Sequence, residues 1–243
     1  ILNKDSVLVE ATSGNTGIAL AMAGKLKGYK VIIIMPDTMS IERRQLVKAF
    51  GAELILTEGA KGMAGSIEKA NELLDKNPNY ICLGQFDNED NPRAHYETTG
   101  PEILKEVKDV SFIVAGIGSG GTIVGAGKFL KEKNKEIKVI GIEPKSSPLI
   151  TENKSGPHKI QGIGANFIPK IYDKDIVDKV ITVSDEDSYE TVRLIANKLG
   201  ILIGISSGAN IFGAMKLSDE NPDKIIVTVA PDGVDKYMSM GIF

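Results

Sequence analysis

Short hydrophobic runs alternate with helical patterns along the first third of the chain. The apolar runs at residues 7–10, 31–35, 53–56 and 80–83 have the length of strands and are bounded by Gly, Pro or Asp, as is typical of strands buried on both faces of a parallel sheet. Between them, residues 17–27, 41–50 and 63–74 carry apolar positions three and four apart, which predicts helices. The alternation predicts βαβ units, with ligands outside the carboxyl ends of the strands.

A second series of the same kind follows residues 84–92. Strands are predicted at 111–116, 138–143, 179–183 and 224–229, and helices near 123–132, 187–199 and 209–217. The economical interpretation is two three-layer α/β domains with mostly parallel sheets and a cleft between them. We expect a smaller, mobile domain over residues 1–87 and a larger one over 88–243.

Composition narrows the classes of function. The 29 basic and 32 acidic residues give a net charge of −3 without a basic stripe, which argues against nucleic acid as a partner. One cysteine, Cys82, and two histidines, His95 and His158, argue against a metal site and suit a reducing cytoplasm. Every apolar run is far shorter than the ~20 residues of a membrane helix. We expect Cys82 to be a small buried hydrophobe and His158 to be solvated.

The loop "ATSGNTG" at residues 11–17 joins a predicted strand to a predicted helix. Unpaired N–H groups at a helix start bind anions, and hydroxyl groups add further donors. The plainer interpretation is that Ser13 or Asn15 merely caps the helix. The run of polar and glycine residues from Thr12 to Gly17 exceeds what one cap needs, which favours a ligand site.

A second loop, "GIGSGGT" at residues 116–122, has the composition of a phosphate cup. It also matches the dinucleotide fingerprint, and Glu143, 22 residues beyond Gly121, has the spacing of a ribose-binding acid. A nicotinamide-dependent dehydrogenase is therefore an alternative. A third loop, "GISSGA" at residues 204–209, taken alone predicts a turn in which Ser206 or Ser207 caps a helix beginning near Ala209.

Together these stretches resemble the O-acetylserine sulfhydrylase (cysteine synthase) family of fold-type II pyridoxal-phosphate enzymes. The resemblance covers nearly the whole chain in family order: "EATSGNTGIALAMA" at 10–23, "MPDTMSIERRQLVKAFGAELILT" at 35–57, "QFDNEDNPRAHYETTGPEI" at 85–103, "GIGSGGT", "GPHKIQGIGANFIP" at 156–169, "GISSGA" and "PDGVDKYMS" at 231–239.

The resemblance implies a role for each matching residue. The substrate carboxylate would be bound by Thr12, Ser13, Gly14, Thr16 and Gln85, and the cofactor's 3′-oxygen by Asn15. The cofactor phosphate would lie in the cup formed by Gly118, Ser119, Gly120, Gly121 and Thr122. Ser206 would face the pyridine nitrogen, although the sequence alone leaves Ser207 open for this role.

The activity implied by the resemblance is β-replacement: O-acetylserine and sulfide give cysteine and acetate through an α-aminoacrylate intermediate, in cysteine biosynthesis. A related replacement or elimination on cysteine or serine, releasing sulfide or forming cystathionine or lanthionine, is the alternative. The resemblance also implies a homodimer and, in some members, docking of the C-terminal tail of serine acetyltransferase.

Two departures from the family pattern qualify this expectation. The family's Schiff-base lysine would precede Ile1, and Lys4 lies too close to the first strand to replace it. We therefore expect upstream sequence to be missing and assign no catalytic residue; a lysine-less, non-catalytic protein is the alternative. Asn166 stands where the family usually has glycine. If this loop lines the pocket, the amide would narrow it or donate a hydrogen bond to the incoming nucleophile or a β-substituent, and an altered specificity, for instance cysteine as donor with release of sulfide, is a hypothesis.

Overall fold

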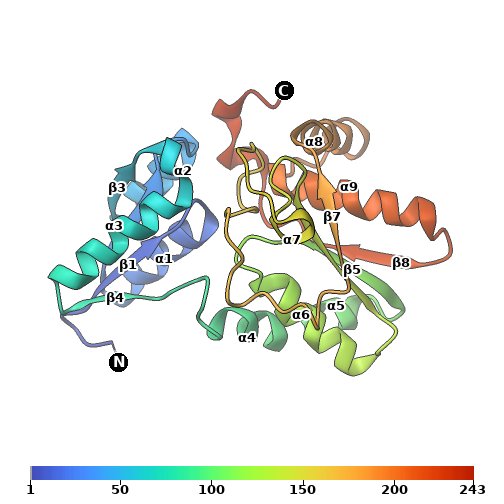
Figure 1. The fold of residues 1–243 in the computed structure, drawn as a ribbon, viewed down its shortest axis with the longest axis horizontal. Helices are drawn as coiled ribbons and strands as arrows, with labels where there is room; N and C mark the ends of the chain where they lie inside the picture. Colours follow the sequence, from blue (N-terminus) through green and yellow to red (C-terminus); the bar gives the residue numbers. More distant parts are fainter. Residues whose placement is uncertain (1) are drawn as a thin grey trace. The chain divides into compact units, whose positions relative to one another are not determined.

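The computed structural model describes residues 2–243, which form two compact units (Figure 1). Unit 1 contains residues 2–85 together with Lys236–Gly241, and unit 2 contains Phe86–Asp235 together with Ile242–Phe243. The sequence pattern placed the boundary after residue 87 and assigned all of residues 88–243 to the second domain. It did not predict that a C-terminal segment returns to unit 1.

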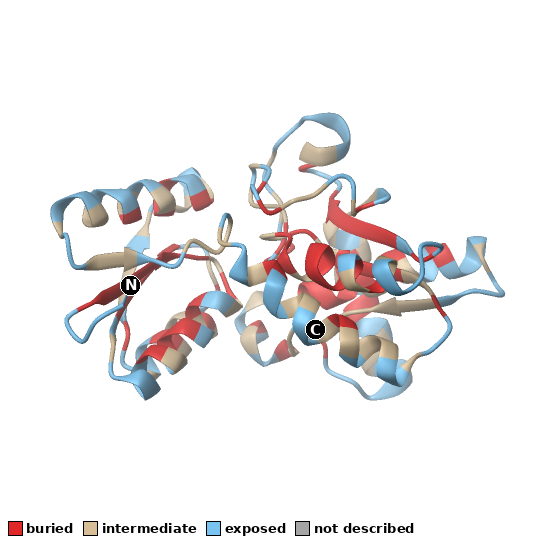
Figure 2. Ribbon diagram, turned by 90° about the horizontal axis from the view of Figure 1, so that it is seen from below, coloured by how far each residue is buried: buried red, intermediate tan, exposed pale blue. Residues whose placement is uncertain are grey.

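Unit 1 is a four-stranded parallel sheet covered by helices on both faces. The strands, in the order β3-β2-β1-β4, are β1 (Val7–Ala11), β2 (Lys30–Pro36), β3 (Glu53–Thr57) and β4 (Tyr80–Cys82). Helices α1 (Asn15–Lys27) and α2 (Ile41–Ala49) pack against each other on one face, and α3 (Gly62–Lys76) covers the other. The buried strand residues of this unit lie in β1 and β2, whereas those of β3 and β4 are half-buried or exposed (Figure 2).

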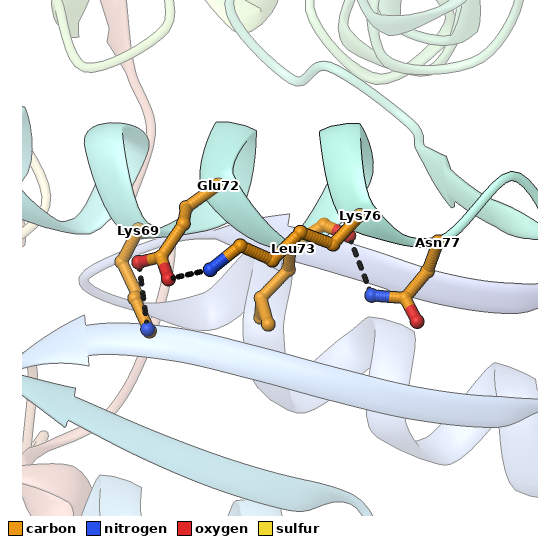
Figure 3. A network of polar contacts seen from close by, with 5 residues as sticks. All are labelled: Lys69, Glu72, Leu73, Lys76 and Asn77. Carbon is orange, nitrogen blue, oxygen red and sulfur yellow. Dashed lines mark hydrogen bonds and ion pairs between the residues drawn. The ribbon is translucent and has the colours of Figure 1, made fainter.

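The central strands of unit 1 explain why the sheet has two covered faces. Ile33, Ile34 and Met35 of β2 are completely buried, so neither face of this strand contacts water. Helix α3, by contrast, is amphipathic. On its exposed side the Glu72 carboxylate pairs with two lysines, with Oε2 2.8 Å from Lys69 Nζ and Oε1 2.7 Å from Lys76 Nζ (Figure 3). Hydrogen bonds from Lys69 and Lys76 lower the pKa of Glu72 to about 2.

Unit 2 repeats the same strand order on a larger scale. Its parallel sheet runs β7-β6-β5-β8, formed by β5 (Val110–Gly116), β6 (Lys138–Pro144), β7 (Lys179–Val183) and β8 (Ile225–Thr228). Helices α4 (Asp90–Glu97), α5 (Thr99–Glu106) and α6 (Gly121–Lys133) pack together, as do α8 (Asp185–Leu199) and α9 (Ile205–Glu220). Within residues 2–243 there are also a single-turn helix, α7 (Leu149–Glu152), and three short 3₁₀ helices, Gly59–Lys61, Val234–Lys236 and Met238–Met240.

The predicted fold class is confirmed, because both units are parallel α/β structures and every predicted strand is present within two residues of its expected limits. Helices α4, α5 and α7 were not predicted. Helix α9 begins at Ile205 and not near Ala209, because its first turn is rich in Ser and Gly and lacks the apolar spacing that marks a helix.

Three further expectations can be compared with the residues that the structure describes. Cys82 is exposed, so its prediction as a buried hydrophobe is wrong. His158 is half-buried, and its Nε2 lies 2.8 Å from the carbonyl oxygen of Gly164, so it is not simply solvated. No helix within residues 2–243 has the length and hydropathy of a membrane span.

Candidate active site

The strand order of unit 1 brings two loops together at the carboxyl edge of its sheet. Strands β2 and β3 lie on one side of β1 and β4 lies on the other, so the direction of winding reverses between β1 and β4. Ligands of doubly wound sheets bind at such a reversal. The loop "ATSGNTG" follows β1, and Gln85 follows β4.

Gln85 is hydrogen-bonded to the loop that follows β1. Its Nε2 donates to the carbonyl oxygen of Ala11 at 2.9 Å, and its Oε1 accepts a hydrogen bond from Thr16 Oγ1 at 2.8 Å. Thr12 Oγ1 accepts from the amide of Gly14 at 3.2 Å. Thr12, Gly14, Thr16 and Gln85, which the sequence placed in one site, are thus brought together.

The start of α1 has no side-chain cap. Gly14 is the N-cap residue, so the interpretation of Ser13 or Asn15 as a capping residue is wrong. Ser13 is half-buried, and its hydroxyl makes no hydrogen bond with any residue that the structure describes. The first N–H groups of the helix have no acceptor within it. The loop therefore offers amide and hydroxyl donors to an anion at the helix N-terminus.

Arg43, on α2, supports this loop from behind. The side chain is 1% exposed, and its Nη1 donates to Asn15 Oδ1 at 3.0 Å. Its Nη2 donates to the hydroxyl of Tyr237, whose ring lies 4.7 Å from the guanidinium carbon. A Cβ at Gly14 would lie 2.9 Å from Nη1, so glycine lets the loop approach the guanidinium closely. The donor group of the Asn15 amide is then its Nδ2.

Sequence reasoning assigned no role to Arg43, although a signal was present. Arg43 and Val47 are the two buried residues of α2, four positions apart on the same side of the helix. A charged residue on the apolar face of a helix indicates a buried polar partner.

The loop "GIGSGGT" of unit 2 can be formed only by glycine at several positions. Gly120 has a φ of 90° and is the N-cap of α6, and a Cβ at Gly118 would lie 2.3 Å from the carbonyl oxygen of Gly162. The loop leaves β5 beside β8, where the winding of this second sheet also reverses. Close backbone approach, a left-handed glycine and a helix N-terminus together form a cradle for a phosphate.

Two side chains of α4 orient the hydroxyls of this loop. Asn91 Nδ2 donates to Ser119 Oγ at 2.9 Å, and the Gly121 amide contacts the same oxygen at 3.4 Å. Thr122 Oγ1 lies 3.1 Å from His95 Nε2. Burial lowers the pKa of His95, so its ring is neutral near pH 7.

Sequence reasoning assigned no role to Asn91 or His95, although both lie within the quoted stretch 85–103. Their presence in a family motif was the available signal. The loop and its supporting side chains fit a phosphate group, because they offer N–H and O–H donors and no carboxylate.

The serines of "GISSGA" lie in the first turn of α9, whose N-cap is Gly204; their prediction as capping residues is therefore wrong. Ser207 is completely buried, and its Oγ donates to the carbonyl oxygen of Asp232 at 3.2 Å. Ser206 is 4% exposed, and its hydroxyl makes no hydrogen bond within the described residues. The Ser206 hydroxyl can therefore still donate or accept a hydrogen bond.

Glu143 does not act as a ribose-binding acid in this structure. It is buried, and its carboxylate accepts hydrogen bonds from the amides of Ile150 and Thr151, at 2.9 and 3.0 Å, and from the Thr151 hydroxyl at 2.5 Å. These bonds hold the first turn of α7 and use both carboxylate oxygens. The arrangement argues against the nicotinamide alternative, which needs this acid for a ribose.

Comparison with known proteins decides the family. Residues 3–232 match the family model described as "Pyridoxal-phosphate dependent enzyme". The chain belongs to this family. It is 48% identical to cysteine synthase B of Campylobacter jejuni over 243 residues, which are 100% of this chain and 81% of that protein.

Two solved structures have the same fold as this chain. Cysteine synthase of Entamoeba histolytica has a TM-score of 0.94 and 45% identity, over 100% of this chain and 72% of that one. A hydrogen sulfide-producing enzyme of Fusobacterium nucleatum has a TM-score of 0.95 and 47% identity, over 98% of this chain and 81% of that one. The predicted family and its cofactor, pyridoxal phosphate, are thereby confirmed.

Asn166, the departure from the family pattern, has a backbone explanation. Its φ is 63°, in the left-handed region that Gly and Asn adopt most readily. Its Oδ1 accepts a hydrogen bond from Ser147 Oγ at 2.7 Å. Asparagine thus replaces glycine at a position where few other residues fit.

Proposed function

We propose that this protein catalyses β-replacement of the cysteine synthase type, converting O-acetylserine and sulfide into cysteine and acetate. The observation that carries the proposal is the pair of loops at the two points where sheet winding reverses: one rich in hydroxyl and amide donors, the other built as a phosphate cradle. Such a pair suits an amino acid and a phosphorylated cofactor.

In unit 1, the loop from Thr12 to Thr16 and the side chain of Gln85 bind the α-carboxylate of the substrate. The free hydroxyl of Ser13 and the amides at the start of α1 supply the donors, and the partial positive charge of the helix N-terminus favours the anion. Asn15 presents its Nδ2 to the cofactor's 3′-oxygen, because Arg43 holds its Oδ1.

In unit 2, Gly118 to Thr122 bind the cofactor phosphate, with Asn91 and His95 fixing the Ser119 and Thr122 hydroxyls. The Ser206 hydroxyl faces the pyridine nitrogen, a role supported by its lack of a protein partner among residues 2–243. When bound, pyridoxal phosphate supplies an electron sink for charge at the substrate's α-carbon. A neutral hydroxyl draws less charge into the ring than a charged partner does, which favours prompt loss of a β-leaving group.

The test is to purify the natural protein with pyridoxal phosphate and to measure cysteine formation from O-acetylserine and sulfide. We expect an absorption band near the violet edge that hydroxylamine removes, and saturable production of cysteine and acetate. Cofactor binding without turnover would support a non-catalytic protein. Tight nicotinamide binding without the band would support the dehydrogenase.

Sulfide release from cysteine is the second candidate, supported by 47% identity to a hydrogen sulfide-producing enzyme. Supplying cysteine in place of O-acetylserine and measuring sulfide separates the two activities. Adding homocysteine or a second cysteine as nucleophile tests the cystathionine- and lanthionine-forming reactions in the same assay.

The likeness to cysteine synthases is the basis of a proposal about assembly and location. We infer a homodimer in the cytoplasm, with the C-terminal tail of serine acetyltransferase as a partner. Sedimentation of the holoenzyme checks the dimer, and a peptide carrying the last ten or so residues of that tail should compete with O-acetylserine. Uncompetitive or absent inhibition would contradict the partner.

A further inference from the structure

A buried carboxylate lies behind the carboxylate-binding loop of unit 1. Glu10 is the fourth residue of β1 and is only 2% exposed. Its two oxygens accept hydrogen bonds from consecutive backbone amides beyond β4: Oε2 from Gly84 at 3.0 Å and Oε1 from Gln85 at 3.1 Å. One side chain thus joins the carboxyl ends of the two strands between which the winding reverses.

Burial and hydrogen bonding act in opposite directions on the Glu10 carboxyl. Burial raises the pKa of the Glu10 carboxyl, while the amide hydrogen bonds from Gln85 and Gly84 oppose that shift. The Cys82 thiol adds a weak contact, with its Sγ 3.6 Å from Oε2. Burying a carboxylate costs free energy, and the hydrogen bonds from these backbone amides offset that cost.

The segment that Glu10 holds includes the functional side chain of this loop pair. Gln85 is fixed at its backbone by Glu10, and its amide group is fixed at one end by Ala11 and at the other by Thr16. Displacing the backbone of Gln85 would therefore move both its own amide and the hydroxyl of Thr16. Both groups belong to the proposed carboxylate site.

We propose that Glu10 is a positioning residue for substrate recognition, which acts through Gln85 to set the geometry that captures the α-carboxylate of the amino acid. The inference rests on the proposed function of this loop. It extends that function to a buried residue outside the proposed carboxylate site.

The test compares Glu10→Gln with the wild-type holoenzyme. The substituted amide places a donor NH₂ against the backbone N–H donors that the carboxylate accepts from, so at least one of these hydrogen bonds is lost while the volume is kept. We expect the Kd for L-serine, measured by calorimetry, and the KM for O-acetylserine to rise about tenfold. The affinity for pyridoxal phosphate should stay within about twofold, since the cofactor phosphate binds in unit 2.

Glu10→Asp provides a second variant, which keeps the charge but shortens the reach and should also weaken L-serine binding. Cys82→Ala is the matched control, because it removes the weak thiol contact to the same carboxylate and leaves both amide bonds in place. Its Kd for L-serine should remain within about twofold of the wild type.

A double-mutant cycle separates positioning from general support of the fold. In a Gln85→Ala background, Glu10→Gln should change the Kd for L-serine by less than about twofold, because the residue through which it acts is absent. An equal loss in both backgrounds, or a lower unfolding temperature with unchanged L-serine affinity, would overturn the inference. Failure of the wild type to bind L-serine would instead contradict the proposed function.

Discussion

At the scale of single residues, the sites depend on backbone positions that accept few side chains. Gly118 packs against the carbonyl oxygen of Gly162, a backbone atom that has little freedom to move aside, and Gly120 is left-handed. The polar side chains of the cup can take their positions only because these glycines let the backbone turn tightly. Substitution at such a position tests the phosphate cradle directly.

Gly118→Ala should lower the affinity for pyridoxal phosphate by at least about tenfold, because its Cβ would lie 2.3 Å from the Gly162 oxygen and the cup must shift. Cofactor titration followed by absorbance measures this effect. Gly28→Ala is the control, since Gly28 is left-handed, with φ 76°, but open space surrounds it in unit 1. It should lower stability without weakening cofactor binding; equal cofactor affinities in the two variants would contradict the prediction.

Asn166→Gly should change the free energy of unfolding by less than about 1 kcal/mol, because glycine adopts a positive φ readily and only the Ser147 hydrogen bond is lost. Asn166→Ala should cost about 1–2 kcal/mol through backbone strain. Chemical denaturation measures both. Comparing O-acetylserine with cysteine as donors in Asn166→Gly then tests specificity, and an unchanged preference would show that Asn166 serves the backbone alone.

At the scale of elements, the C-terminal segment Lys236–Gly241 is fastened to α2. The hydroxyl of Tyr237 accepts from Arg43, and Glu42 accepts from the amide and hydroxyl of Ser239, at 2.6 and 2.8 Å. Because Arg43 also holds Asn15, this segment supports the first turn of α1 through one buried guanidinium. An element far along the chain thus contributes to the loop after β1.

Tyr237→Phe should destabilise the protein by about 1–3 kcal/mol, because a buried donor of Arg43 loses its acceptor while the aromatic ring stays. Urea denaturation at neutral pH measures the change. Ser239→Ala is the control on the same segment, and its effect should be smaller because the bond to Glu42 is exposed. A Tyr237→Phe variant as stable as Ser239→Ala would contradict the role assigned to Arg43.

At the scale of the whole molecule, the two units share the same local arrangement of strand, loop and buried acid. Each sheet has a central strand followed by a polar, glycine-containing loop, and each has a buried glutamate, Glu10 or Glu143, at the carboxyl end of a strand. Each glutamate accepts two neighbouring backbone amides from a segment elsewhere in its unit. Glu10 therefore holds the segment after β4, and Glu143 holds the first turn of α7, each near the carboxyl end of a strand.

The buried groups give the stability of the molecule a defined pH dependence. Burial lowers the pKa of His95 below its usual 6.5, so the unfolded state takes up the proton first on acidification. The contribution of neutral His95 is complete above pH 6.5 and is lost as the pH falls through the folded-state pKa. We therefore expect the stability difference between wild type and His95→Gln to shrink from pH 7 to pH 5, as measured by urea denaturation.

Glu10 supplies a control of opposite sign. Burial raises the pKa of its carboxyl above 4.5, so its contribution is complete below pH 4.5 and is lost as the pH rises through the folded-state value. The free energy of unfolding of Glu10→Gln, relative to that of the wild type, should therefore increase as the pH rises through that window. Parallel pH profiles for His95→Gln and Glu10→Gln would contradict at least one of the two assignments.

The strands and the polar loops of this protein were predicted from the sequence. The strands were predicted within two residues because uniformly apolar runs bounded by turn residues have few other interpretations, as β2 illustrates. The polar loops at residues 11–17 and 116–122 were found for a similar reason, since glycines and hydroxyls between a strand and a helix are a local signal. The start of α9 was missed because Ser206, Ser207 and Gly208 carry no helical periodicity.

Only the tertiary structure decided which residues support those loops. Gln85 is hydrogen-bonded to Glu10, which lies 75 positions away in the sequence, and Arg43 is hydrogen-bonded to Tyr237, 194 positions away. His95 reaches Thr122 across 27. Local pattern determines which segments become strands, helices and polar loops, because period and turn chemistry act within a few residues. Strand order and packing determine which of those segments become neighbours, so the supporting residues emerged only from the folded chain.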